Sequence, residues 1–446
     1  MRISDSSALN GAGCRIFGLG RSNEALISFL NRNGADVTVS DKRMSENEIA
    51  SKLSALGCKN VKIIPYNETV RTDFVFRTPG IHPDSPEIVS AIGSGAILSS
   101  EAELFFNIAK GKILGVTGSD GKTTTTTLAH LMLSNAIGKE SVFIGGNIGV
   151  PLISFVDKLS DDSITVCELS SFQLMTMDRA PGRAVITNIT ENHLDYHKSF
   201  REYVLAKLNI FSEGCITPII SKKIYDFIYK SGFNVPINPL LTDVIKSDCK
   251  VYLSNSVIYV DDVPFLNLEE VAAKEKYNAE NYMNAIALAL PWIDSGTVMK
   301  VAKEFKGVEH RNELVREVGG IRYFNCSVDS TPSRTVETLK NHTSRKVVLI
   351  CGGYDKNLDY SPLGRYISDN GIVTVVMGQT ANKIISSLNE NDRFFRATDL
   401  NDAISIAIGL SREGYDVVFS PASASFDMFK DFDERGKLFK NIINNI

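Results

Sequence analysis

The sequence predicts an α/β protein built on parallel sheets. Short apolar runs rich in β-branched residues recur along the chain, and stretches with the apolar spacing of helices separate most of them. This alternation is typical of strand–helix–strand units, in which the strands run parallel and helices cover the faces of the sheet. The chain has 446 residues, which is enough for several domains at the usual size of about 100–200 residues each.

The first hundred residues show the alternation most clearly. We expect strands at 14–20, 35–41 and 73–80, and a helix at 23–34 that stops at a glycine. The first of these strands ends in glycines, and the third is broken by a Pro-Gly pair. This part of the chain therefore predicts one parallel sheet of its own.

A second block of the same kind begins near Ser100. Residues 212–272 are less regular, and we expect short strands there, with a turn at Asp261 and Asp262. The regular elements predicted in this block are strands at 112–118, 163–169 and 184–189 and helices at 123–133, 200–211 and 278–290.

A third α/β block follows Gly307. A hairpin is predicted over 314–324, because two strand-like runs flank Gly319-Gly320. Further strands, separated by helical segments, are predicted at 345–353, 372–378 and 416–421.

Charge and composition limit the possible partners. Lysine plus arginine (48) nearly balances aspartate plus glutamate (52), so the formal net charge is −4. That balance gives no general attraction to nucleic acid or an anionic membrane, and any phosphate must be held by a local site. No apolar run approaches the roughly 18–20 residues that span a bilayer, and the start of the chain lacks the apolar core of a signal peptide. Seven scattered cysteines without CxxC suit reduced thiols in a cytoplasmic protein rather than a zinc site.

The strongest chemical motif is VTGSDGKTTTT (116–126), between a predicted strand and a predicted helix. Glycines let backbone N–H groups turn toward a phosphate, and the positive end of the helix faces the same anion. Lys122 can reach the outer phosphates, and the Thr123 hydroxyl can bind Mg²⁺. The strict GxxxxGK[ST] pattern fails at Val116. The expected nucleotide-binding residues here are Gly118, Ser119, Asp120, Gly121, Lys122, Thr123 and Thr124.

A weaker glycine loop, GLGRSN (18–23), follows the first strand. It resembles GxGxxG with Asn23 in the last glycine position, and Asp41 stands where a ribose-binding acid would lie. The alternative is an ordinary strand–helix turn.

Polar residues follow two strands of the second block. Glu168 in CELSSFQL ends an apolar strand and can hold Mg²⁺ against bound phosphates, or it is a solvated strand-end acid. In NITENHLDYH (188–197), His193 is a metal ligand, a hydrogen-bond donor or a structural histidine, and His197 is a surface residue or a helix cap. Lys207 lies in an apolar helix; as a lone residue it is better explained as a side chain that reaches the surface than as a functional amine.

The third block has similar strand-end motifs. Arg311 in HRNE could clamp a phosphate or stack on a base. In GGYDK (352–356), Lys356 could bind an anion, and in SPASASFD (420–427), Ser423 and Ser425 could donate hydrogen bonds.

Taken together and in order, these motifs resemble those of the Mur ligases, ATP-dependent amide-forming enzymes of peptidoglycan precursor synthesis. The matching segments are VTGSDGKTT, GGNIGVP (145–151), ELSSFQL, NITENHLDYH, AKLNIF, HRNE, GGYDK and SPASASFDMFKDF, and they span nearly the whole chain. ELSSFQL and SPASASFD point to the glutamate-adding branch, and no DNPR-like motif of the diaminopimelate- or lysine-adding branch is found.

The resemblance implies three domains. They are an N-terminal Rossmann-like domain for the UDP substrate (1–100), a central P-loop ATPase-type parallel sheet (101–306) and a C-terminal Rossmann-like amino-acid-binding domain (307–446). It implies a cytoplasmic monomer that joins D-glutamate to UDP-N-acetylmuramoyl-L-alanine through an acyl phosphate, with ATP and two Mg²⁺ sites, and with neither nucleic acid nor membrane as partner.

The resemblance also assigns roles to residues. Lys122, Glu168, His193 and Lys207 would be catalytic, with Lys207 carbamylated, and the metal ligands would be Thr123, Glu168, His193 and Lys207. Asn278 and Arg311 would contact the nucleotide. The expected substrate-binding residues are Gly20, Arg21, Ser22, Asp41 and Arg43 for uridine diphosphate, Asn147, Ser170, Gln173 and His193 near muramoyl-alanine, and Lys356, Ser425, Phe426 and Phe432 for D-glutamate.

Two positions depart from the family pattern. Tyr277 replaces a histidine, and Cys326 replaces an aspartate that helps to grip the ATP ribose. We expect weaker nucleotide binding, or a replacement contact from elsewhere.

Three alternatives stay open at this point. The nearest is a sibling Mur ligase or a folylpolyglutamate-synthase-like ligase with another amino-acid acceptor. The second is a nucleotide-gated binding protein without ligase activity, and the third is a dehydrogenase that uses GLGRSN, which would leave VTGSDGKTT unexplained.

Overall fold

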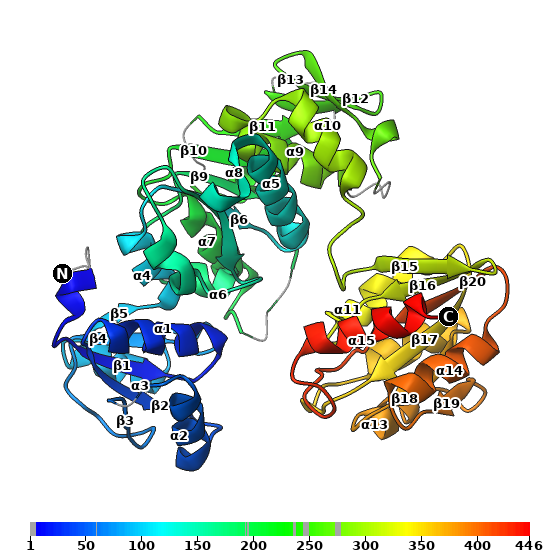
Figure 1. Ribbon diagram of the computed structural model, residues 1–446, viewed down its shortest axis with the longest axis horizontal. Coiled ribbons are helices and arrows are strands. Elements are labelled where there is room, and N and C mark those ends of the chain that lie inside the picture. Colours follow the sequence, from blue (N-terminus) through cyan, green and yellow to red (C-terminus); the bar gives the residue numbers. More distant parts are fainter. Residues whose placement is uncertain are drawn as a thin grey trace. The chain divides into compact units, whose positions relative to one another are not determined.

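The computed structural model describes residues 6–446 except 59, 192, 194–195, 235–237, 244–248 and 273–277. The described elements form three separate sheets. The chain divides into two compact units, Met1–Phe305 and Lys306–Ile446; the first contains two of the sheets and the second contains the third (Figure 1). These sheets confirm the predicted α/β fold class.

The first sheet has five parallel strands in the order β3-β2-β1-β4-β5. Side chains alternate along the central strand: Cys14 and Ile16 join the core under α1, whereas Phe17 packs on the opposite face with Ile88 of α3. The elements are β1 (Gly13–Phe17), α1 (Arg21–Arg32), β2 (Asp36–Ser40), α2 (Glu46–Ala55), β3 (Lys62–Ile63), β4 (Phe74–Arg77), α3 (Pro86–Gly93), β5 (Ile97–Ser99) and α4 (Glu101–Ile108).

The second sheet has nine strands in the order β14-β13-β12-β11-β10-β9-β6-β8-β7. Its neighbouring strands pair parallel except β12 with β13 and β13 with β14, which pair antiparallel. The elements are β6 (Lys112–Thr117), α5 (Lys122–Ile137), β7 (Val142–Gly146), β8 (Ile164–Glu168), α6 (Ser171–Leu174), β9 (Arg183–Ile186), α7 (Phe200–Leu208), β10 (Thr217–Ser221), α8 (Lys222–Lys230), β11 (Leu240–Asp243), β12 (Val251–Ser254), β13 (Val257–Val260), β14 (Val263–Asn267), α9 (Asn278–Ala289) and α10 (Ser295–Glu304).

The irregular part of this block contains the short strands that we expected. Asp261 and Asp262 connect β13 to β14, and both have positive φ angles (48° and 65°), as a tight turn requires. Helix α5 packs against α9 and α10. Because Ala285, Ile286 and their neighbours in α9 are fully buried, the apolar sequence of this helix is explained by its place in the core.

The third sheet has six strands in the order β15-β16-β20-β17-β18-β19, with only the β15–β16 hairpin antiparallel. The hairpin turns at Gly319 and Gly320, both at positive φ, as predicted. The elements are β15 (Glu313–Val318), β16 (Ile321–Asn325), α11 (Pro332–Leu339), β17 (Lys346–Gly352), α12 (Ser361–Asn370), β18 (Val373–Met377), α13 (Ala381–Ile385), β19 (Phe394–Arg396), α14 (Leu400–Leu410), β20 (Tyr415–Phe419) and α15 (Phe432–Asn444).

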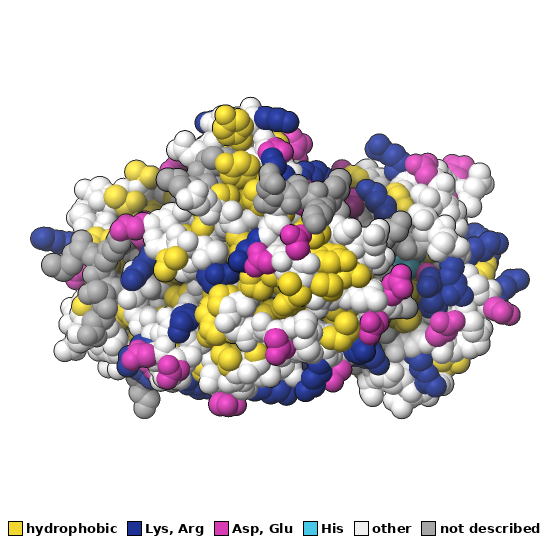
Figure 2. All heavy atoms as spheres, turned by 90° about the horizontal axis from the view of Figure 1, so that it is seen from above, with side chains coloured by type: hydrophobic (Ala, Val, Ile, Leu, Met, Phe, Trp, Pro, Cys, Tyr) yellow, Lys and Arg dark blue, Asp and Glu magenta, His cyan; other side chains and the backbone are white. Residues whose placement is uncertain are grey.

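The surface carries both signs of charge. Figure 2 shows lysine and arginine side chains interspersed with aspartate and glutamate on the face it displays. No helix in the described part of the chain is long and apolar enough to cross a membrane.

Strand order positions the candidate site. Strand β6 lies between β8 and β9, and all three are parallel. Their carboxyl ends therefore meet at one edge of the sheet and present the loops that begin at Gly118, Leu169 and Thr187 there.

Candidate active site

The backbone conformation and close packing of the loop between β6 and α5 require glycine at two positions. Gly118 has φ 152° and Gly121 has φ 76°. A Cβ atom at Gly118 would lie 1.9 Å from Thr187 Oγ1, and one at Gly121 would lie 2.4 Å from Asn281 Oδ1. A side chain at either position would displace the loop, so only glycine permits this close approach to neighbouring side chains.

The segment after β9 fixes the shape of this loop. The Ser119 N–H donates to the Asn188 carbonyl (3.0 Å), and the Asp120 N–H donates to Asn188 Oδ1 (2.7 Å). The Ser119 hydroxyl donates to the Thr190 carbonyl and shares a hydrogen bond with the Tyr203 hydroxyl (2.8 Å). The loop is thus held before any ligand arrives, and the first N–H groups of α5 have no partner within the helix.

Lys122 folds back over the loop. Its Nζ donates to the carbonyls of Gly118 and Ser119, both at 2.9 Å. A phosphate bound at the start of α5 would meet this ammonium group directly. Thr123 and Thr124 follow in the first turn of α5, and both are buried.

Glu168 accepts hydrogen bonds from two other predicted site residues. Its carboxylate is only 1% exposed. Oε2 accepts a hydrogen bond from the Thr123 hydroxyl (2.8 Å), and Oε1 accepts one from Asn147 Nδ2 (2.7 Å). A hydroxyl and a carboxylate side by side at the end of a phosphate-type loop form an oxygen-rich donor set, which is the kind that Mg²⁺ prefers.

Lys207 approaches the same loop from α7. Its side chain is only 2% exposed, Nζ donates to the Gly118 carbonyl at 2.7 Å, and it lies 4.6 Å from the centre of the Tyr203 ring. Burial and, secondarily, the charge of Lys122 hold the pKa of the Lys207 ammonium well below its usual value. The explanation of Lys207 as a side chain that reaches the surface is therefore wrong.

The two histidines after β9 differ in environment. His193 is exposed, has φ 56°, and packs edge-on against Phe172 with ring centres 5.0 Å apart. His197 is buried: its Nε2 lies 2.9 Å from Ser171 Oγ, and its Nδ1 lies 3.5 Å from a Glu202 carboxylate oxygen. Burial lowers the His197 pKa. The surface or helix-cap interpretation of His197 is wrong, whereas Asp195, from the same motif, lies outside the described residues.

Ser170 and Gln173 form the cap of α6. The Ser170 hydroxyl accepts from the Gln173 N–H (3.2 Å), and Gln173 Oε1 accepts from the Ser170 N–H (2.9 Å). This reciprocal arrangement fixes the segment that follows Glu168.

The glycine loop after β1 is closed by a side chain. Asn23 is buried, and its Nδ2 donates to the carbonyls of Phe17 (3.2 Å) and Gly18 (2.8 Å). Asp41 bridges to the neighbouring loop by accepting from the Leu19 N–H (2.7 Å) and the Arg43 N–H (2.8 Å). The predicted uridine diphosphate residues thus lie after the ends of the adjacent strands β1 and β2: Gly20 in the loop after β1, Arg21 and Ser22 in the first turn of α1, and Asp41 and Arg43 in the loop after β2.

The two strand-end loops of the third sheet also meet. The Tyr354 N–H donates to the Ala424 carbonyl (2.9 Å), and the rings of Tyr354 and Phe426 lie 6.0 Å apart. Lys356 Nζ lies 5.9 Å from the centre of the Phe426 ring, which is 60% exposed. Ser425 is buried beside them, and exposed Phe432 begins α15.

The nucleotide contacts expected at Asn278 and Arg311 belong to different units, and the side chain of Asn278 is outside the described set. Tyr277 also lies outside it. Cys326 is fully buried in the core of the second unit. Asp329, three residues further on, is a buried carboxylate that accepts from the hydroxyls of Thr338 (2.6 Å) and Ser420 (2.8 Å).

Arg77, at the end of β4, is a buried residue of this region that the sequence motifs do not include. Its buried guanidinium donates to the carbonyls of Phe172 (2.7 Å) and Ile81 (2.8 Å), and lies 3.4 Å from the Tyr196 hydroxyl. Arg77 therefore ties the first sheet to the segments that carry Gln173 and His193. The sequence around a single arginine in a strand does not indicate such a contact.

In the described part of the second unit, Glu309, His310 and Asp433 lie close enough together to bind a metal ion. Its two carboxylates already form ion pairs, Glu309 with Lys440 (2.8 Å) and Asp433 with Lys437 (2.6 Å). These lysines neutralise the group, so its geometry is explained without an ion.

Comparisons with known proteins show the family to which the chain belongs. Residues 116–289 match the model of the Mur ligase middle domain. UDP-N-acetylmuramoylalanine–D-glutamate ligase of Acetivibrio thermocellus is 39% identical over 97% of this chain and 96% of its own length. Proteins of that name from Ruminiclostridium cellulolyticum (37%) and Clostridium botulinum (38%) cover the same shares.

Solved structures share the fold. The UDP-N-acetylmuramate-alanine ligase MurC of Thermotoga maritima aligns over 97% of this chain and 99% of its own, with a TM-score of 0.58 and 20% identity. The MurF ligase of the same organism, solved in complex with ADP, aligns over 99% of this chain and 97% of its own, with a TM-score of 0.52 and 14% identity. The chain belongs to the Mur ligase family, in the group of the UDP-N-acetylmuramoylalanine–D-glutamate ligases.

Proposed function

We propose that this chain is an ATP-dependent amide ligase that joins D-glutamate to UDP-N-acetylmuramoyl-L-alanine and releases ADP and phosphate. The observation that carries this proposal is the near-complete alignment with D-glutamate ligases at 37–39% identity. The substrate carboxylate attacks the γ-phosphate of ATP, and an acyl phosphate forms. The amine of D-glutamate then attacks the acyl carbon, loses a proton, and phosphate leaves.

The main task of the site is to let two anions meet. A carboxylate and a triphosphate repel each other, and a carboxylate needs phosphorylation to gain a good leaving group. Lys122, held against the Gly118 and Ser119 carbonyls, supplies a fixed positive charge where the phosphoryl group moves. The first N–H groups of α5 add donors for the phosphate oxygens.

The donor set around Glu168 fits Mg²⁺. Thr123 and Glu168 already lie 2.8 Å apart, oxygen to oxygen, and would hold one ion; Glu168, His193 and a carbamylated Lys207 would hold a second. Bound Mg²⁺ would neutralise phosphate charge and orient the triphosphate. Asn147 donates to Glu168 and so directs the remaining lone pairs of this carboxylate.

The environment of Lys207 supports the proposal that this residue is carbamylated. An amine must be unprotonated to attack CO₂, and burial lowers the Lys207 pKa strongly. The amine nitrogen bonds to the carbon of CO₂ and releases one proton, which converts a buried cation into an anionic oxygen ligand. That product relieves the repulsion between Lys207 and Lys122.

The remaining predicted binding residues are assigned to ligands domain by domain. We assign Gly20, Arg21, Ser22, Asp41 and Arg43 of residues 1–100 to the uridine diphosphate; Asn147, Ser170, Gln173 and His193 of residues 101–306 to muramoyl-alanine; and Lys356, Ser425, Phe426 and Phe432 of residues 307–446 to D-glutamate. Asn278 and Arg311 would contact the nucleotide, together with Gly118, Ser119, Asp120, Gly121 and Thr124.

The test is phosphate release with UDP-N-acetylmuramoyl-L-alanine, ATP and Mg²⁺, comparing D-glutamate with L-glutamate and a panel of other amino acids. The proposal predicts release that depends on D-glutamate. Release that depends on another amino acid would assign the chain to a sibling ligase, and no turnover with any acceptor would overturn the ligase assignment.

A further inference from the structure

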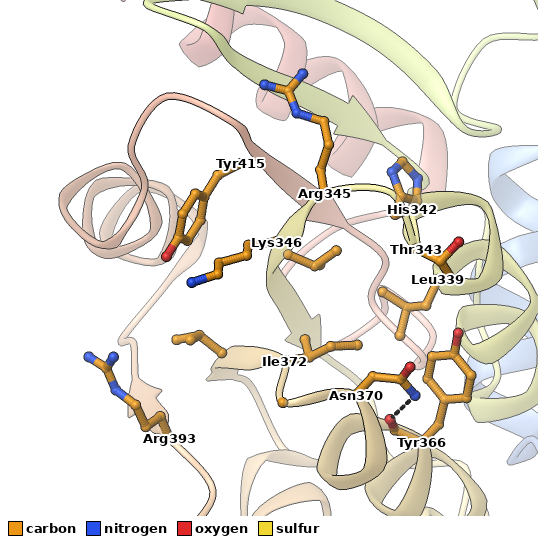
Figure 3. A pocket seen from close by; sticks show the side chains of 13 residues that line it. Leu339, His342, Thr343, Arg345, Lys346, Tyr366, Asn370, Ile372, Arg393 and Tyr415 are labelled. Atoms are coloured by element: carbon orange, nitrogen blue, oxygen red, sulfur yellow. Dashed lines mark hydrogen bonds between the residues drawn. The ribbon is translucent and has the colours of Figure 1, made fainter.

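A hollow of about 350 Å³ lies within the second unit, at the amino ends of three parallel strands (Figure 3). Its lining includes Lys346, Val373 and Tyr415, the first residues of β17, β18 and β20. The loops that carry Lys356 and Ser425 follow the opposite ends of β17 and β20. The hollow is therefore separate from the proposed amino-acid pocket.

The lining combines an apolar wall with cations. Leu339, Ile372 and the ring of Tyr366 contribute to the wall, and Lys346 and Arg393 bring positive charge. None of the lining residues, all of which are described, is an aspartate or a glutamate. Volume, apolar walls and a few charged groups of one sign are the features of a small-ligand pocket.

Two of these cations have no carboxylate to neutralise them. Arg345 already has partners within the protein, because its guanidinium donates to the Gly320 carbonyl and lies 3.5 Å from buried Asp416. Figure 3 shows its side chain pointing away from Lys346. Lys346 and Arg393 form no ion pair with any residue in the described part of the chain.

The ends of two helices offset only part of this charge. Helices α11 and α12 end at Leu339 and Asn370, beside the hollow. Each helix end carries roughly −0.5 of an elementary charge, so the two together balance about one of the two free cations. A net positive potential remains over an apolar wall.

We propose that this hollow binds a small organic anion, in which a ring or short apolar chain carries one phosphate, sulfonate or carboxylate group. The apolar body lies against Leu339, Ile372 and Tyr366, and the anionic group meets Lys346 and Arg393. The site is independent of the ligase reaction.

The probe is 8-anilinonaphthalene-1-sulfonate, an aromatic sulfonate whose fluorescence rises in an apolar site. Titration of the full chain, with ATP and Mg²⁺ present to fill the nucleotide site, predicts one saturable site. The double reversal Lys346→Glu/Arg393→Glu weakens binding about tenfold or more, because charge-assisted contacts become repulsive. Lys346→Arg/Arg393→Lys keeps the affinity within about threefold, since the charge remains.

Two controls separate this site from general probe binding. Lys223→Glu/Lys300→Glu changes the net charge equally at exposed positions of the other unit, and the affinity stays unchanged. N-phenyl-1-naphthylamine lacks the sulfonate and binds more weakly than the anionic probe. The proposal is overturned if the wild type and the Lys346→Glu/Arg393→Glu variant bind the probe equally. It is also overturned if the control variant loses as much affinity as that variant. If the Lys346→Glu/Arg393→Glu variant loses thermal stability but binds the probe as the wild type does, the two cations stabilise the ends of α11 and α12 and do not bind a ligand. That result would also overturn the proposal.

Discussion

Glu101 makes the stability of the first unit depend on pH. It is the first residue of α4, it is buried, and Oε1 accepts a hydrogen bond from the Ile153 N–H at 2.7 Å. Burial raises the pKa of this carboxyl from 4.5 to about 7. Between those two pH values the folded state binds more protons than the unfolded state, so the free energy of unfolding falls as pH rises through this window.

The magnitude follows from the same values. At 1.36 kcal/mol per pH unit, the interval from 4.5 to about 7 corresponds to roughly 3 kcal/mol. The positive end of α4 offsets about 0.3–1 kcal/mol of that cost by favouring the anion. Glu101→Gln keeps an acceptor oxygen for Ile153 but cannot ionise. The variant should therefore match the wild type near pH 4, below both pKa values, and exceed it by about 2–3 kcal/mol near pH 8.

Urea unfolding followed by tryptophan fluorescence measures this difference, because the single tryptophan, Trp292, lies in the same unit. Glu46→Gln is a matched control: Glu46 is also the first residue of a helix, α2, but it is exposed. A difference between Glu101→Gln and the wild type that is the same at both pH values would refute the role of Glu101 ionisation, and so would the same effect in Glu46→Gln.

Four further substitutions test the site and its supports. Lys207→Ala should nearly abolish phosphate release, with partial rescue by added acetate or another short carboxylate; full activity would remove Lys207 from the site. Lys122→Ala should lower the rate of phosphate release by ~10²-fold or more, and a smaller loss in a folded variant would contradict its role. Arg77→Met should lower the free energy of unfolding by about 2–3 kcal/mol, because three carbonyls lose a buried partner; an unchanged urea midpoint would count against this. Cys326→Asp places a carboxylate in a fully buried position and should lower the melting temperature rather than improve the KM for ATP, and a folded variant with a lower KM would show that the ribose lies within reach.

The parts of the site that are local in sequence could be predicted, because their physics is local. Gly118 and Gly121 are needed by backbone conformation and close approach, and Thr123 follows in the same helix turn. Glu168 could be placed nearby because it ends the strand adjacent to β6, and parallel strands bring their carboxyl ends together.

The parts of the site that depend on packing between distant segments could not be predicted from the sequence. Lys207 sits among apolar residues in sequence, which fits both a buried amine and a side chain that reaches solvent; only the position of α7 against the loop decides between them. His197 and Arg77 are buried by contacts with Ser171, Phe172 and Tyr196. Nothing in the local pattern of either residue indicates these partners.

Isotope transfer shows whether an acyl phosphate forms during the reaction. UDP-N-acetylmuramoyl-L-alanine labelled with ¹⁸O in its terminal carboxylate is incubated with the enzyme, ATP, Mg²⁺ and D-glutamate, and the released phosphate is analysed by mass spectrometry. An acyl phosphate retains one carboxylate oxygen on phosphorus when its C–O bond breaks, so we expect one ¹⁸O in each phosphate derived from fully labelled substrate. Amide product accompanied by unlabelled phosphate would contradict the mechanism.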